Sequence, residues 1–162
     1  EIISNWNGAA GNAGTSVFLG LTGQDTVRFC DVYSIAGKIS DQRNPFVLTA
    51  LNGEDRSAVF FNGGEIVSRD SALPPRNLST AWVIGQQGNI NGEYWNGGMA
   101  EIRVYARALS DAERLSVERA MLAEYKIPSA IPAAKKLLPP ETLALASLAH
   151  VLLNSNEFLY VD

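Results

Sequence analysis

The chain has 162 residues, with 13 lysines and arginines against 17 aspartates and glutamates, for a net charge of -4. This length suits one compact domain with a short appendage, and the lack of a basic surplus argues against nucleic acid as a partner. An apolar content of 46% with 14 glycines and 7 prolines is typical of a loop-rich globular protein, and it excludes disorder and a collagen repeat.

Cysteine and histidine each occur once, at Cys30 and His150, so neither an internal disulfide nor a structural zinc site is expected. The first residue is Glu1, and no basic stretch followed by an apolar run opens the chain. We interpret the sequence as part of a longer protein. The most apolar run, residues 143–153, has about half of the ~20 residues that cross a bilayer, so no membrane span is predicted.

Residues 15–105 have the pattern of a β protein, with short apolar or alternating runs separated by Gly, Asn, Asp and Pro clusters. No helical pattern lies between these runs, which favours an antiparallel sandwich over a parallel βαβ sheet. The Asn62-Gly63-Gly64 run predicts a tight hairpin. Strands are expected over residues 16–21, 27–33, 45–51, 57–62, 65–68, 81–85 and 98–105.

The pattern changes at residue 109. Ser110 and Glu113 have the spacing of a capping box, which predicts a helix over residues 111–124, ended before Pro128. Residues 128–140 contain four prolines and are expected to form an extended linker. A second, very apolar helix is predicted after it, within residues 141–162, where it would be covered by another domain.

Catalytic motifs are missing from the sequence. No Glu is followed two residues later by Asp, the strand-borne arrangement of a retaining glycosidase pair. The nucleophile elbow, the dinucleotide fingerprint and the phosphate-binding lysine loop are absent as well. His150 lies in an apolar helical pattern and is expected to be packed rather than catalytic. The chain is therefore predicted not to be an enzyme, with a glycoside hydrolase kept as a remote alternative.

The loop over residues 92–98 carries the candidate ligand-binding residues. Aromatic faces can stack on sugar rings while Asn and Glu bind hydroxyl groups. The alternative, which we weight more strongly, is that Trp95 closes the sandwich core; Trp82 and Trp6 are expected in the core as well. The candidates are Glu93, Tyr94, Trp95 and Asn96.

Calcium is a second open question. Several aspartates lie in or next to turn-like segments, but they lack EF-hand spacing. Each is expected to be a solvated loop residue, while a calcium site assembled from different loops stays open because calcium accepts varied oxygen ligands. These aspartates are Asp25, Asp31, Asp41, Asp55 and Asp70. No other cofactor is expected.

Three stretches carry a resemblance to a known family: Trp82-Val83-Ile84-Gly85, the run from Trp95 to Tyr105, and Ala108-Leu109-Ser110-Asp111-Ala112-Glu113-Arg114. Together they resemble the closing segment of laminin G-like domains of the concanavalin A-like lectin/glucanase superfamily. The resemblance covers residues 1–127 and implies an all-β jelly-roll sandwich. A complete jelly roll has more strands than the sequence predicts here, so the N-terminal strands are expected to be missing, leaving an unpaired edge and uncovered apolar surface.

The tail carries a second resemblance. Pro140-Glu141-Thr142-Leu143 and the run from Leu148 to Asp162, with its Leu-Leu-Asn-Ser-Asn-Glu-Phe stretch, are similar to the C-terminus of the planctomycete-type cytochrome-associated domain of unknown function. That family occurs in large exported bacterial proteins, which implies a periplasmic or cell-surface location. The haem-attachment Cys-x-x-Cys-His is absent, so no redox role is implied.

These expectations combine into one functional prediction. The resemblances imply a non-catalytic, lectin-like binding module of a larger exported protein, with a glycan or a protein as ligand. The alternative is a structural spacer that packs against the other domains of its parent chain, which the apolar final segment favours.

Overall fold

A computed structural model describes residues 1–6, 17–29, 35–74, 78, 81–88 and 91–132 of the chain. The chain divides into two compact units, Glu1–Ile131 and Pro132–Asp162. The fold and the site described below belong to the first. The predicted second helix, most of the predicted linker, Cys30 and His150 lie outside the described residues.

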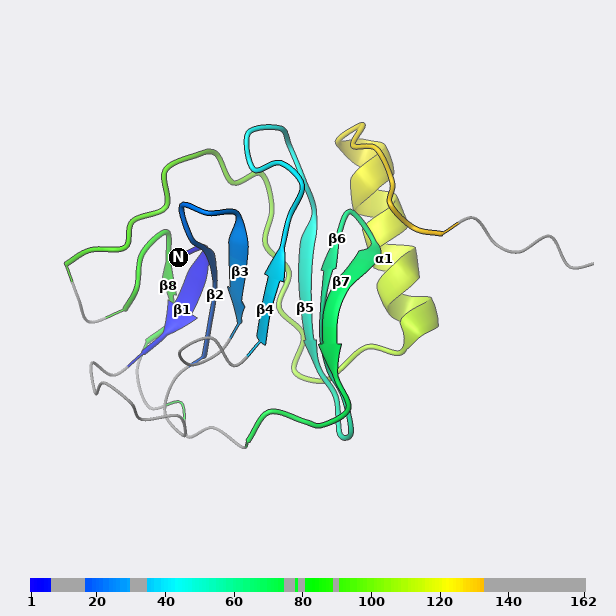
Figure 1. Cartoon of the computed structure of the whole chain (residues 1–162), viewed down its shortest axis with the longest axis horizontal. Coiled ribbons are helices and arrows are strands. Elements are labelled where there is room, and N and C mark those ends of the chain that lie inside the picture. Colours follow the sequence, from blue (N-terminus) through cyan, green and yellow to red (C-terminus); the bar gives the residue numbers. More distant parts are fainter. Residues whose placement is uncertain (7–16, 30–34, 75–77, 79–80, 89–90, 133–162) are drawn as a thin grey trace, which may run out of the picture. The chain divides into compact units, whose positions relative to one another are not determined.

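Two antiparallel sheets form the body of the first unit (Figure 1). The larger sheet has the strand order β4-β3-β2-β1-β8, and the smaller one has the order β5-β6-β7. The prediction of an all-β sandwich followed by a helix is confirmed at this level. The elements are β1 (Ile3–Asn5), β2 (Val17–Leu21), β3 (Thr26–Phe29), β4 (Ile35–Lys38), β5 (Leu48–Asn52), β6 (Ser57–Phe61), β7 (Gly64–Arg69), β8 (Val83–Ile84) and α1 (Asp111–Glu124).

The hairpin between β6 and β7 is the one that the sequence predicts. Asn62 and Gly63 have φ angles of 50° and 83°, and Phe61 pairs with Gly64 across the turn. Two consecutive residues with positive φ match the right-handed twist of the flanking strands, and Asn-Gly accepts this conformation at low cost.

The core lies between the two sheets. Val27 and Phe29 of β3 pack with Val59 and Phe61 of β6, and all four are buried. Every residue of β6 is buried, because its other face is covered as well: the Arg114 guanidinium of α1 lies 3.7 Å from the centre of the Phe60 ring. Alternate residues of a strand point to opposite faces, so β6 separates the core from the helix.

The helix has the predicted bounds and the predicted cap. The Ser110 hydroxyl accepts from the Glu113 N–H, and the Glu113 carboxylate accepts from the Ser110 N–H at 2.8 Å, which completes the capping box. Its buried residues, Arg114, Glu118 and Leu122, are four apart and therefore form one stripe.

Two sequence predictions about the fold are wrong, and two strands were not predicted. Residues 98–105 form no strand, although they alternate in the expected way. β1 and β4 were not predicted, because β1 has three residues and β4 contains Gly37, whose lack of a side chain lets Val67 approach. Trp82 is 47% exposed rather than in the core. Strand formation needs a partner edge and burial needs a covering layer, and local patterns encode neither.

Candidate functional site

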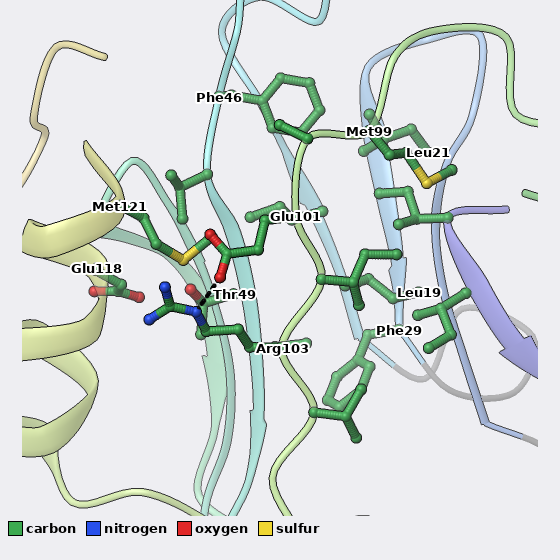
Figure 2. A pocket seen from close by; sticks show the side chains of 18 of the residues that line it. Leu19, Leu21, Phe29, Phe46, Thr49, Met99, Glu101, Arg103, Glu118 and Met121 are labelled. Carbon is green, nitrogen blue, oxygen red and sulfur yellow. Dashed lines mark hydrogen bonds and ion pairs between the residues drawn. The ribbon is translucent and has the colours of Figure 1, made fainter. Parts of the chain in front are cut away.

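A large cleft lies along β5 (Figure 2). Its volume is about 1550 Å³, and its walls come from the inner face of the larger sheet, from β5, from residues 94–109 and from α1. Leu19, Leu21 and Phe29 form an apolar wall on one side, while Glu101 and Arg103 point towards the helix on the other. The cleft is therefore apolar over most of its surface and polar near α1.

Both faces of β5 line the cleft. Leu48 and Ala50 pack against the core, whereas Thr49 and Leu51 lie on the alternate face, which is the face that α1 covers on β6. A hollow that touches both faces of an edge strand lies beside its free edge. The cleft therefore occupies the place where a further strand of the smaller sheet would lie.

The register of β5 with β6 determines which way the backbone N–H and C=O groups of β5 point. The Asn62 N–H donates to the Val47 C=O at 2.8 Å, and the Gly53 N–H donates to the Arg56 C=O at 2.7 Å. Hydrogen-bonded pairs alternate along an antiparallel ladder, so the backbone groups of Thr49 and Leu51 face β6. The N–H and C=O groups of Leu48 and Ala50 then face the cleft.

Residues 94–109 form the wall opposite β5. This segment is tied at one end by the Trp95 N–H, which donates to the Gly85 C=O at 2.8 Å, and at the other by the Ser110 cap. Between these ends, no backbone hydrogen bond joins residues 96–109 to another described segment. Among the residues that the structure describes, both strand-like walls of the cleft thus carry backbone groups without a hydrogen-bond partner.

A polar cluster lies at the helical end of the cleft. Arg103 Nε donates to Glu101 Oε1 at 2.5 Å, and the Tyr125 hydroxyl donates to Glu101 Oε2 at 3.3 Å. The hydrogen bond from Arg103 holds the pKa of Glu101 below its ordinary value. Partial desolvation and the nearby carboxylates of Glu124 and Glu101 raise the pKa of Tyr125.

Two buried polar atoms of the cleft residues have no hydrogen-bond partner within the described chain. The first is Glu118 Oε1; the side chain is 2% exposed, and its other oxygen accepts from Arg114 Nη1 at 2.5 Å. The second is the indole Nε1 of Trp95. Buried polar groups are normally paired, so these two enclosed atoms are exceptions among the described residues.

The structure brings together three of the four predicted ligand-binding residues. Tyr94, Trp95 and Asn96 all line the cleft, and Tyr94 is 61% exposed. The exposed Trp82 lines it as well. Glu93 does not, because its carboxylate binds Arg28 on the other face of the larger sheet. Trp95 is half-buried.

Glu93 belongs to a charged cluster that the sequence did not predict. Arg28 Nη1 lies 2.7 Å from Glu1 Oε1 and 2.8 Å from Glu93 Oε2, so two carboxylates share one guanidinium nitrogen. Burial and a hydrogen bond with Glu93 raise the pKa of Glu1 to about 7. Partial burial opposes the charge of Glu93, but hydrogen bonds from Glu1 and Arg28 hold its pKa below the ordinary value. The cluster ties the loop before Tyr94 to β3.

The predicted calcium ligands are not brought together. Asp25 is in the β2–β3 turn, Asp55 in the β5–β6 turn and Asp70 after β7, while Asp41 accepts from Arg43 and Asn44. Asp31 lies outside the described residues. Within the described ranges, no three His, Cys, Asp or Glu side chains are grouped as metal ligands.

The carboxylates that line the cleft are already paired with arginines. Glu101 binds Arg103 and Glu118 binds Arg114. These residues were not identified as functional from the sequence. A signal was present, because residues two apart on an extended segment and residues four apart on a helix lie on the same face and can form ion pairs.

The fold and the cleft define a class of protein: a two-sheet antiparallel β sandwich with a covering helix and an open edge. The sequence matches no protein-family profile. A search of curated proteins finds no significant match either. Among solved structures, the chain is similar to a fragment of an S-layer domain-containing protein from Clostridium thermocellum, with 16% identity and a TM-score of 0.41 over 68% of this chain and 59% of that one. In the part of the chain that the structure describes, no helix could span a bilayer.

Proposed function

We propose that this chain is a non-catalytic binding module whose ligand enters the cleft beside β5. The observation that carries this proposal is the cleft itself, which combines apolar walls with the outward-facing backbone groups of Leu48 and Ala50. Ligand sites are typically concave, mostly apolar and provided with a few polar groups that fix orientation. The laminin G-like resemblance of residues 1–127 adds a jelly-roll topology to the proposal, and the resemblance of the tail adds an exported parent protein.

A glycan is the ligand that the cleft mouth favours, where the mouth is the part of the cleft lined by Trp82, Tyr94 and Asn96. Tyr94 and Trp82 are exposed aromatic side chains that line the same cleft, and Asn96 lies two residues from Tyr94. Exposed aromatic rings offer apolar faces for sugar rings, and a neighbouring amide can bind their hydroxyl groups.

A glycan-array screen of the whole chain tests this proposal, with calcium and again with a chelator. We expect binding to a defined sugar, weakened about tenfold by Tyr94→Ala or Trp82→Ala, since an aromatic contact contributes roughly 0.5–1.5 kcal/mol beyond its buried area. Leu78→Ala is the matched control, because Leu78 is exposed but does not line the cleft. Glycan binding that both aromatic variants retain would contradict a site at the mouth.

The second candidate function is a structural spacer. Ile84 of β8 is 61% exposed and does not line the cleft, so its aliphatic side chain is available for packing against a further domain. A folded chain that binds no glycan but binds other domains of its parent protein would support this alternative.

A further inference from the structure

We infer that the cleft interior binds an uncharged, extended polypeptide strand of a protein partner, which pairs with the free edge of β5. The inference goes beyond glycan binding at the mouth, because it concerns the backbone of β5 rather than the aromatic side chains.

The backbone of β5 offers hydrogen-bonding groups to an incoming strand. Leu48 and Ala50 present N–H and C=O groups to the cleft, as the register with β6 requires. Unpaired edges of this kind are templates for another strand, which gains main-chain hydrogen bonds along its length. Neither a sugar nor a small apolar molecule could satisfy such a regular row of donors and acceptors.

The size and shape of the cleft suit an extended strand. Its volume of about 1550 Å³ exceeds the roughly 300–1,000 Å³ of pockets for small molecules. The hollow touches both faces of β5, so side chains of an added strand would alternate between the apolar wall at Leu19 and Phe29 and the polar side near Glu118. The strand would thus have apolar residues on one face and uncharged polar residues on the other.

The charged side chains of the cleft favour an uncharged strand. Each charged side chain that lines it is already in an ion pair: Glu101 with Arg103, Arg114 with Glu118, Arg107 with Glu113, and Arg43 with Asp41. A charge on the incoming strand would be buried without compensation, which is costly. Hydroxyl and amide side chains carry no charge and can still form hydrogen bonds on the polar side of the cleft.

The test uses a defined probe, a capped nine-residue peptide of alternating threonine and valine, titrated into the whole chain. The control peptide has the same composition except for a central proline, which removes a ladder donor. We expect saturable binding of the first peptide, and binding of the control that is weaker by about tenfold, on the scale of one or two lost hydrogen bonds. Equal binding of both peptides, or no binding of the first, would overturn the inference.

A variant locates the site. Ala50→Pro removes an N–H that faces the cleft without removing a bond to β6, so it should reduce peptide affinity by about tenfold. Amide exchange of the unsubstituted chain supplies a second readout that does not depend on this variant folding: the Leu48 and Ala50 amides should be protected only when the peptide is present. Protection of these amides in the peptide-free chain would show that its own residues or a second copy occupy the edge, and would overturn the inference.

The two proposals fail separately. Ala50→Pro leaves Tyr94 and Trp82 in place, so glycan binding should persist in it. If Tyr94→Ala loses glycan binding but retains peptide binding, the glycan contacts Tyr94 and the peptide does not need it.

Discussion

Glu113 is a residue whose ionisation is strongly changed by its neighbours in sequence. The Arg107 guanidinium, together with the Ser110 N–H and hydroxyl, lowers its pKa to about 2 from an ordinary 4.5. All these partners lie within six residues along the chain, so the capping box and its charge are set by local sequence. The helix start should therefore respond to acid.

We predict that the N-terminal turn of α1 weakens in strong acid. Because the folded-state pKa is depressed, the stabilisation by Glu113 is fully present above pH 4.5 and is lost as the pH falls through about 2. NMR titration of the Glu113 carboxyl and of the Ser110 amide measures this loss. Glu113→Gln should abolish the response over this range, whereas Glu124→Gln at the other end of the helix should leave it unchanged. An unshifted Glu113 titration would contradict the prediction.

At the scale of elements, the β6–β7 hairpin and α1 were predictable, and the reason is the same for both. Asn62-Gly63 and Ser110…Glu113 each satisfy their own backbone through contacts that are close in sequence. β1 and β4 depend on neighbours that are distant in sequence, since Ile3 pairs with Ile84 and Gly37 packs against Val67. Residues 98–105 have a strand pattern but form no backbone hydrogen bond with another segment of the described chain.

The hairpin gives a stability prediction. Gly63 has a φ of 83°, and a Cβ there would lie 2.2 Å from Ile131 Cγ1. Gly63→Ala should lower the free energy of unfolding by about 1–2 kcal/mol or more, from backbone strain and this clash. Gly23→Ala is the matched control: no atom lies within 4 Å of its Cβ position, and its φ is not in the left-handed region. Urea denaturation of both variants compares them, and equal stabilities would contradict the prediction.

At the scale of the whole first unit, the two sheets share a core but the smaller sheet ends at an open edge. β6 is buried on both faces, whereas β5 has the cleft on its free side. Residues 96–109 cross this opening without backbone hydrogen bonds to another described segment. Local stability should therefore differ sharply between the middle of the smaller sheet and its edge.

Hydrogen exchange measures this difference. We predict that amides of residues 98–108 exchange orders of magnitude faster than those of Val59 and Phe60 in the peptide-free chain, because β6 is buried and paired on both sides whereas residues 98–108 form no backbone hydrogen bond with another described segment. Exchange of residues 98–108 as slow as that of β6 would mean that this segment is paired as a strand in solution. Adding the threonine-valine peptide should slow exchange in β5 and in residues 98–108 together.

The candidate site was predictable in part. Tyr94, Trp95 and Asn96 are consecutive, so one loop delivers all three to the cleft mouth. Glu93 was assigned to the same group, but Arg28 of β3 draws its carboxylate to the other face of the sheet. The pairs Glu101–Arg103 and Arg114–Glu118 are short-range, yet their position inside a cleft depends on where the helix packs.

The sequence by itself determined the β pattern, the Asn62-Gly63 turn and the capped helix, because alternation, turn chemistry and capping act between residues that are close along the chain. Only the tertiary structure decided which strands pair, that Trp82 is exposed, and that the edge of β5 stays open. Pairing and burial are properties of surfaces brought together from distant parts of the chain. The cleft is one of these properties, which is why the binding surface emerged from the fold and not from a motif.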